Sequence, residues 1–280
     1  MPRASVAADR AVPAARAVPA ARLTLDADDF WKSLVAAASD PYRKADAHAH
    51  RFARAKLGGD RVFRYVVERG LIAPGARVVD MGCGQGLLAS LLGAAGAASD
   101  GGRWPAAWAG APQRAHVTGI DLSTHDLARA VTALDDAAVF VHADMRSFDI
   151  PPCDVVVFFD TLHYIGNAEQ DEVLARARAA LRPGGTLLLR VNDAAATGRF
   201  ALGLWIDRFT MLLHGGGFGR LAGRPLAGWR ASLEGLGFQV ESLQMNGRPP
   251  FANLLLVARL ASGANAQRSS IHSSDAASSC

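Results

Sequence analysis

The residues with the most specific chemical potential lie at 78–88, where an apolar run ends in Asp80 and glycines follow at every second position from 82 to 86. Glycine allows positive φ and lets a ligand approach the main chain closely. A helix-forming segment begins at once, and the unpaired amides of a helix N-terminus attract polar or anionic ligands. This order of strand, glycine turn and helix predicts a cradle for a nucleotide-like ligand.

Three further acids, Asp121, Asp144 and Asp160, each stand where a later apolar run ends. In open α/β sheets, ligands bind at the carboxyl ends of the parallel strands. One carboxylate has two acceptor oxygens, so Asp121 is suited to take both hydroxyls of a ribose. The alternative is that Asp121 only caps the helix expected to begin near residue 124.

Strands and helices alternate between these acids in the manner of an α/β fold. Apolar runs predict strands over 77–81, 116–121, 138–142, 154–159, 186–191, 238–245 and 251–260. Periodicity predicts helices over 26–38, 41–57, 60–70, 86–95, 124–136 and 168–181. The run at 155–159 is apolar throughout, as expected when helices cover both faces of a parallel sheet. Only a short turn separates the last two strands, which are therefore predicted to pair antiparallel.

The motifs occur in the order shared by class I S-adenosylmethionine-dependent methyltransferases, and the chain resembles that family from about residue 76 to 260. They are 79–86, with the acid-plus-G-x-G-x-G signature, 119–123, 142–145, 160–164 and 181–186. The resemblance implies a Rossmann-like methyltransferase fold: a doubly wound, mostly parallel seven-stranded sheet with an antiparallel terminal strand. It also implies S-adenosyl-L-methionine as cofactor. An NAD-dependent dehydrogenase, the less favoured alternative, would need a glycine at position 87, where this chain has Leu87.

The same resemblance implies roles for single residues. Asp144 would accept from the adenine amino group while the Met145 amide serves a ring nitrogen; otherwise Asp144 is a simple loop acid. Asp80 would orient the glycine loop or take the methionine ammonium through water. The predicted cofactor-binding residues are Asp80, Gly82, Cys83, Gly84, Gly86, Asp121, Leu122, Asp144, Met145 and Asp160.

Methyl transfer is a displacement at a sulfonium methyl group, so alignment in a dry site lowers its barrier. A general base is needed only if the nucleophile arrives protonated. His163, in the loop after the fourth strand, is the candidate base, although a histidine there can also simply pack the loop. Tyr164 is the second catalytic candidate and would line the acceptor pocket.

The acceptor is predicted to be a small molecule. Residues 1–22 carry +3 of the formal charge of +4, which leaves a core too balanced to indicate a nucleic-acid surface. Candidate substrate contacts are Tyr42, Arg54 and Trp205; Trp205 lies on an apolar helical face over 199–213 that could equally be core.

Residues 41–60 are also similar to methyltransferases of bacterial aryl-polyene and related pigment or fatty-acid pathways. That similarity implies an aromatic or acyl intermediate as the acceptor, either free or bound to a carrier protein. A module that binds the cofactor without turnover is the non-enzymatic alternative.

Composition divides the chain into a disordered arm at 1–22, a helical lid at 23–72, a cofactor-binding domain at 73–261 and a disordered tail at 262–280. Asp121 lies 35 residues after Gly86, where about 20 is usual, so a loop insertion is predicted at 94–114. It is interpreted as a surface insertion or, alternatively, as a partner-binding flap.

The longest apolar segment, 201–218, is broken by charges and glycines, so no integral membrane segment is predicted. The three cysteines have neither metal-ligand spacing nor an even count. A metal site is therefore not expected, and a reducing, cytoplasmic location is predicted.

Overall fold

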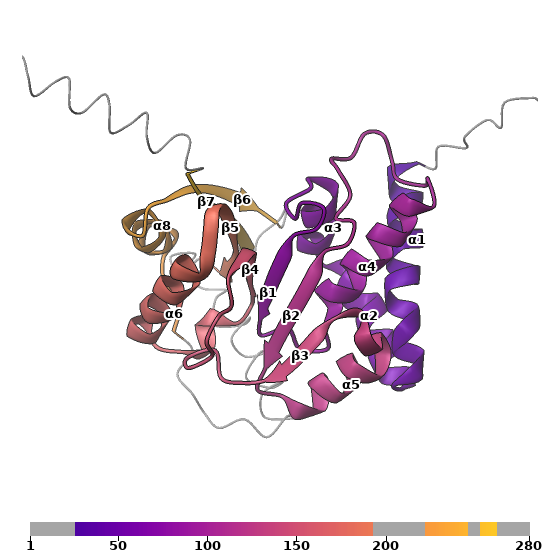
Figure 1. Cartoon of the computed structure of the whole chain (residues 1–280), viewed down its shortest axis with the longest axis horizontal. Helices are drawn as coiled ribbons and strands as arrows, with labels where there is room; N and C mark the ends of the chain where they lie inside the picture. Colours follow the sequence, from indigo (N-terminus) through magenta and orange to yellow (C-terminus); the bar gives the residue numbers. More distant parts are fainter. Residues whose placement is uncertain (1–25, 193–221, 246–252, 262–280) are drawn as a thin grey trace, which may run out of the picture.

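A computed structural model of the 280-residue chain describes residues 26–192, 222–245 and 253–261. Its centre is a seven-stranded sheet in the order β3-β2-β1-β4-β5-β7-β6 (Figure 1). The strands are β1 (Arg77–Met81), β2 (His116–Asp121), β3 (Val139–His142), β4 (Cys153–Phe159), β5 (Leu181–Asn192), β6 (Phe238–Gln244) and β7 (Asn253–Leu260). β7 pairs antiparallel with β5 and with β6, and the other pairs are parallel. The predicted mostly parallel sheet with an antiparallel terminal strand is confirmed.

Helices cover both faces of the sheet (Figure 1). One face carries α1 (Ala27–Ser39), α2 (Ala47–Gly59), α3 (Arg61–Glu68), α4 (Leu87–Asp100) and α5 (Thr124–Leu134); the other carries α6 (Asn167–Ala180) and α8 (Leu226–Gly235). Successive strand residues point to opposite faces. Val78 therefore joins the core beneath α1–α4, while Val79 joins the core beneath α6 and α8. This burial on both sides explains why the strands are apolar without alternation.

The N-terminal helices share the first of these cores, because their buried side chains cluster with Val78 and with α4. The single helix predicted over 41–57 is wrong. A 3₁₀ turn, η1 (Asp40–Lys44), is followed by the separate helix α2. Asp46 causes the break, since its Oδ1 accepts a 2.7 Å hydrogen bond from the Ala49 amide and caps a new helix.

The loop insertion predicted over 94–114 is partly helix, because α4 continues to Asp100. Its alanines at 95 and 98 are buried and prolong the apolar face of the helix. Beyond it, Trp108 is buried and meets Phe30 of α1 edge to face, with ring centroids 5.2 Å apart. Trp104 makes a similar contact with Phe30 at 5.6 Å. The two tryptophans therefore attach this loop to α1.

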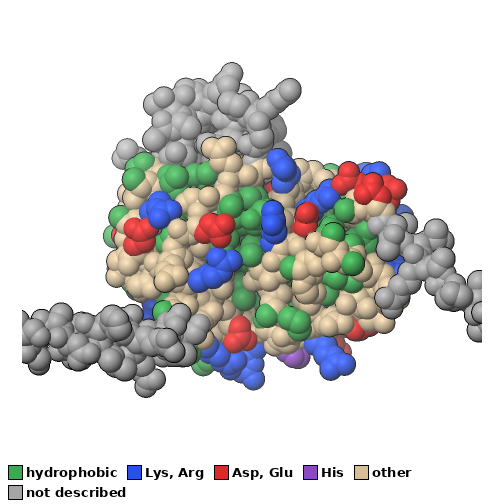
Figure 2. All heavy atoms as spheres, turned by 90° about the horizontal axis from the view of Figure 1, so that it is seen from above, with side chains coloured by type: hydrophobic (Ala, Val, Ile, Leu, Met, Phe, Trp, Pro, Cys, Tyr) green, Lys and Arg blue, Asp and Glu red, His purple; other side chains and the backbone are tan. Residues whose placement is uncertain are grey.

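Basic and acidic side chains are interspersed on the face seen in Figure 2. In the described ranges, no helix has the length and apolar character to cross a membrane. The predicted arm at 1–22, the tail at 262–280 and Trp205 with its apolar helix lie outside the described residues.

The packing of the loop on α1 can be tested by Trp108→Ala. Loss of the buried ring should lower the free energy of unfolding by about 3–5 kcal/mol, as measured by urea denaturation. Val131→Ala, on the exposed side of α5, is the matched control and should change it by less than about 0.5 kcal/mol. An unchanged urea midpoint for Trp108→Ala would contradict the packing described here.

Candidate functional site

The glycine loop leaves β1 in a left-handed backbone conformation. Gly82, Gly84 and Gly86 have φ values of 85°, 53° and 73°. A Cβ at Gly82 would collide with Thr161, and one at Gly86 would lie 2.6 Å from Phe140 Cζ. A Cβ at Gly84 would meet nothing within 4 Å. The outer glycines thus allow close packing, whereas the middle one leaves open space beside the main chain.

Backbone hydrogen bonds hold this loop against β2 and the N-terminal helices. The amides of Gly82 and Cys83 both donate to the Ile120 carbonyl, at 2.8 and 2.9 Å. On the opposite side, the buried Tyr42 hydroxyl donates to the Gln85 carbonyl at 2.7 Å. Tyr42 therefore supports the loop from within the core, and its predicted contact with the substrate stays a prediction.

Asp121 lies at the carboxyl end of β2 and faces the loop. Its Oδ2 accepts from the Gly84 amide and its Oδ1 from the Ser123 amide, both at 2.8 Å. Ser123, and not Asp121, is the N-cap of α5, because its hydroxyl accepts from the Asp126 amide at 3.2 Å. The neighbouring Leu122 is 59% exposed. A carboxylate and an exposed apolar side chain thus stand side by side at the edge of the loop.

Among the acids of the site, Asp80 has the pKa that departs furthest from its ordinary value. It is 5% exposed, and burial together with the nearby Asp121 carboxylate raises its pKa to about 7. Burial, together with the Asp80 and Asp121 carboxylates, also raises the pKa of the Cys83 thiol. Cys83 is therefore a neutral thiol, and its amide is already bonded to β2.

Asp144 follows β3, and its carboxylate already accepts hydrogen bonds from Arg146, two residues further along the chain. Arg146 donates to it from its backbone amide at 2.8 Å and from its guanidinium at 2.6–3.1 Å. The side-chain hydrogen bond from Arg146 lowers the pKa of Asp144 most strongly. The carbonyl of Met145 accepts from Arg176 at 2.6 Å. An adenine amino group would therefore share the Asp144 carboxylate with Arg146.

The loop after β4 carries the two catalytic candidates. His163 and Tyr164 lie in η3 (Leu162–Tyr164) with ring centroids 4.2 Å apart, and Tyr164 is 38% exposed. Thr161 ties this loop to β1 through a 3.0 Å bond from its hydroxyl to the Met81 carbonyl. The buried Gln170 amide of α6 donates to the carbonyls of Leu162, Ile165 and Ala222 at 3.0–3.1 Å. The loop is thus fixed against both β1 and α6.

A cluster of four charges holds the beginning of that loop. The guanidinium of Arg190, on β5, is 7% exposed and pairs with the carboxylates of Asp160 and Asp60. Lys56 lies 2.9 Å from Asp60 and 3.5 Å from Asp160. Asp160 itself has a left-handed φ of 58°. The cluster connects α2, the N-cap of α3, β4 and β5 at one point.

These charges stabilise each other against the cost of burial. Burial acts to raise the pKa of Asp60, but Arg190 and Lys56 outweigh it and the pKa lies below its usual range. For Arg190 burial disfavours the charge, yet Asp160 and Asp60 keep the pKa raised. Asp60 and Arg190 are therefore both ionised at neutral pH.

The structure brings several of the predicted residues together at one edge of the sheet. Asp80, the three glycines, Asp121 and Asp160 gather at the carboxyl ends of β1, β2 and β4. Arg54 lies on the exposed side of α2. Within the described ranges there is no group of three His, Cys, Asp or Glu that could hold a metal ion.

Two buried residues of the site were missed from the sequence, Arg190 and Gln170. A signal existed for Arg190, the only charge in the apolar run 187–191, because a buried charge requires a partner. Gln170 gave no comparable signal, since it lies on a helix with many polar residues.

The fold and the glycine loop define a doubly wound α/β protein, a class in which ligands bind at the carboxyl edge of the sheet. Residues 40–243 match the methyltransferase domain family. The chain belongs to this family. The dehydrogenase alternative is thereby set aside.

Among curated proteins, the chain is 34% identical over 120 residues to a carboxy-S-adenosyl-L-methionine synthase of Chromohalobacter salexigens, covering 41% of this chain and 39% of that protein. A similar synthase of Psychrobacter arcticus is 26% identical over 164 residues, covering 57% of this chain and 56% of the relative. The chain thus spans less than two thirds of these relatives.

Solved structures show the same fold at low identity. An O-methyltransferase family protein from Burkholderia thailandensis superposes with a TM-score of 0.53 at 22% identity, covering 79% of this chain and 62% of the other. A chain from the Haloferax volcanii complex of the Trm112 methyltransferase activator and a putative methyltransferase gives 0.54 at 17% identity, with coverages of 81% and 97%.

The charge cluster predicts a strong effect of Arg190→Gln. The partly buried carboxylates of Asp60 and Asp160 would then have only Lys56 as a cationic partner, so the free energy of unfolding should fall by about 3–5 kcal/mol. Arg182→Gln is the control: it breaks the exposed 3.2 Å pair with Asp154 and should cost less than about 1 kcal/mol. Equal losses for both variants in chemical denaturation would show that the cluster has no special role.

Proposed function

We propose that the glycine loop, Asp121 and Asp80 bind S-adenosyl-L-methionine, and that the chain transfers its methyl group to a small-molecule acceptor. The observation that carries the proposal is Asp121, whose carboxylate is fixed on the Gly84 amide at the loop. Both of its oxygens keep a free lone pair for a ribose hydroxyl. Open space at Gly84 and the exposed Leu122 give the ribose and adenine a main-chain and an apolar surface.

The buried Asp80 suits the positively charged end of the cofactor. A cation near a carboxylate favours the ionised form and lowers its pKa. The raised pKa of Asp80 means that the glycine loop alone does not neutralise the negative charge of the Asp80 carboxylate. We infer that the methionine ammonium does so, directly or through water.

Held there by the glycine loop, Asp121 and Asp80, S-adenosyl-L-methionine would supply a methyl group on a cationic sulfur for transfer to an acceptor lone pair, with the carbon–sulfur electron pair returning to sulfur. The chain contributes position and exclusion of water. Thr161 and Gln170 fix the loop that carries His163 and Tyr164. His163 would take a proton from an acceptor that arrives protonated, and Tyr164 would contact the acceptor.

Asp160 has a different role in this proposal from the one predicted for it. Its carboxylate is engaged by Arg190 and Lys56, so it orients the catalytic loop and leaves direct cofactor contact to Asp121 and Asp80. For the acceptor, the similarity at residues 41–60 supports an aromatic or acyl intermediate. The interspersed charges of Figure 2 give no support to a nucleic-acid acceptor.

Asp121→Ala should weaken binding of S-adenosylhomocysteine about a hundredfold in isothermal titration, because two charge-assisted hydrogen bonds to the ribose are lost. Asp136→Ala removes an exposed acid outside the site and should bind like the wild type. Circular dichroism checks that both variants are folded. Wild-type affinity in folded Asp121→Ala would exclude the proposed ribose contact.

Cofactor affinity should depend on pH through Asp80. If the ammonium binds ionised Asp80, a pKa of about 7 makes the affinity for S-adenosylhomocysteine about tenfold weaker at pH 6 than at pH 8. Asp80→Asn should bind more weakly and lose most of this dependence. A variant that keeps the full pH dependence would assign the titration to another group.

Mass spectrometry of the cofactor products distinguishes the remaining alternatives. A methyltransferase incubated with a metabolite extract yields S-adenosylhomocysteine together with a methylated acceptor. The names of the curated relatives suggest carboxy-S-adenosyl-L-methionine as a second product to look for. A module that only binds the cofactor would return it unchanged, which would overturn the proposed turnover.

A further inference from the structure

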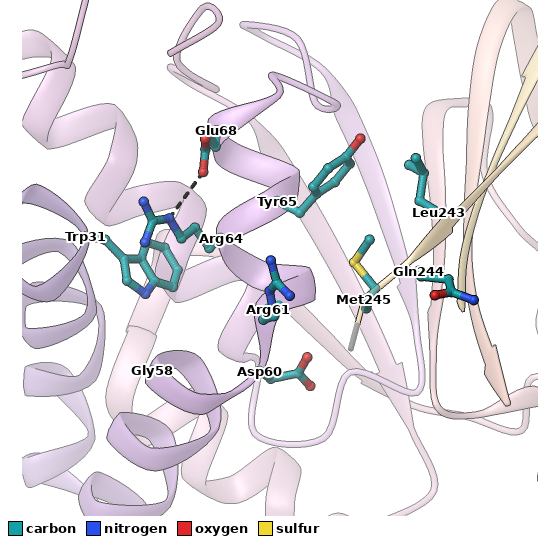
Figure 3. A pocket seen from close by; sticks show the side chains of 10 residues that line it. All are labelled: Trp31, Gly58, Asp60, Arg61, Arg64, Tyr65, Glu68, Leu243, Gln244 and Met245. Carbon is teal, nitrogen blue, oxygen red and sulfur yellow. Dashed lines mark hydrogen bonds and ion pairs between the residues drawn. The ribbon is translucent and has the colours of Figure 1, made fainter. Parts of the chain in front are cut away.

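A cavity of about 530 Å³ lies between α3 and the end of β6. Figure 3 shows α3 along its centre, Trp31 of α1 on one side and Leu243, Gln244 and Met245 on the other. This volume is in the range of sites that enclose small molecules. Nothing in the function proposed above uses it.

The acidic side chains of the cavity wall already have cationic partners. Asp60 pairs with Arg190 and Lys56. Glu68 accepts from Arg64 at 3.1 Å, and Arg64 also pairs with Asp28 at 2.7 Å. Neither wall carboxylate therefore needs a cation from a ligand.

Arg61 differs from these groups. It is the first residue of α3 and is exposed, and its guanidinium makes no hydrogen bond or ion pair with the described part of the chain. Figure 3 shows it between Asp60 and Tyr65, with Met245 across from it. Its guanidinium presents a planar fork of donors that matches a carboxylate.

Apart from Gln244 and Gly58, the rest of the wall is apolar or aromatic. Trp31 and Met245 are buried, and Tyr65 and Leu243 are half-buried with surface toward the cavity. Apolar and aromatic walls with few polar groups bind the body of a ligand, and the polar groups orient it. The combination fits a small carboxylic acid with an aromatic or other apolar body.

The cavity is linked to the loop that carries the catalytic candidates through the charge cluster. Asp60 forms part of its wall and is linked through Arg190 to Asp160 at the end of β4. A ligand in the cavity would therefore lie beside the charge cluster that holds the beginning of the catalytic loop.

We propose that this cavity binds the non-reacting end of the methyl acceptor, a carboxylic acid whose carboxylate pairs with Arg61 and whose apolar body lies against Tyr65, Leu243 and Met245. The inference rests on the proposed function, since it assigns the acceptor of that reaction. The carboxylate is the anchor and not the methylated atom, because Arg61 holds its charge.

The proposal is tested with 4-hydroxycinnamate and its neutral amide as probes in isothermal titration. The wild type should bind the acid about tenfold more tightly than the amide, because only the acid pairs with Arg61. Arg61→Glu should abolish this preference and Arg61→Lys should keep part of it. Arg51→Glu, on the exposed side of α2, makes the same change in net charge and should retain it.

Arg61→Glu is expected to fold, because an acid in the first turn of a helix interacts favourably with the helix dipole. No preference for the acid in the wild type, or its loss in both glutamate variants, would overturn the proposal. Titration of S-adenosylhomocysteine into the same samples separates the two claims. Failure of the wild type to bind it contradicts the proposed function, whereas normal binding with an unaltered acid preference in Arg61→Glu contradicts the cavity assignment alone.

Transfer of labelled methyl groups to a metabolite extract provides a readout that requires turnover. After anion-exchange separation, the wild-type label should elute with the acids, and Arg61→Glu should reduce that fraction at least tenfold relative to Arg51→Glu. Label found mainly in neutral or cationic products would contradict the assignment.

Discussion

Three left-handed glycines lie within five residues of the loop after β1, which has an internal hydrogen bond from the Gly86 amide to the Cys83 carbonyl at 2.9 Å. Residues outside the loop supply further hydrogen bonds. The Ile120 carbonyl accepts two loop amides, and the Asp121 carboxylate accepts the amide of Gly84. The same carboxylate is the one that faces the proposed cofactor site. Loop conformation and ligand recognition therefore depend on one side chain at the end of β2.

The N-terminal helices are joined to this arrangement at two points. Tyr42 donates to the Gln85 carbonyl, and the Ser90 hydroxyl of α4 donates to the Ala38 carbonyl at 2.6 Å. Near the loop after β4, Asp60 and Lys56 reach Arg190 and Asp160. These helices are part of the core as well as a border of the site. Whether they also open and close as a lid stays a prediction.

The sequence contained enough information to predict the sheet, because buried strands require apolar runs and the family motifs mark their ends. It also placed Asp80 and Asp121 at one edge, since the carboxyl ends of parallel strands meet there. The predicted end of α4 was wrong, because the alanine-rich sequence after Gly93 contains glycines that are typical of a loop. The buried alanines of this segment nevertheless continue the apolar face of the helix. The helix break at Asp46 depended on a single capping bond.

The sequence pattern did not predict which charged side chains pair with each other in the folded chain. Arg190 meets Asp60 across 130 residues and Asp160 across 30, and no local signal specifies which acids neutralise a buried arginine. The occupation of Asp144 by Arg146 was equally hidden, because an arginine two residues away is common in loops. Sequence thus predicted which residues lie at the site, and the structure determined which of them are available to a ligand.

A crystal structure with S-adenosylhomocysteine tests the central claim most directly. The ribose hydroxyls are expected within hydrogen-bond distance of the Asp121 carboxylate, with the adenine against Leu122 and the ammonium toward Asp80. A ligand bound away from the glycine loop, or a ribose that does not contact Asp121, would contradict it.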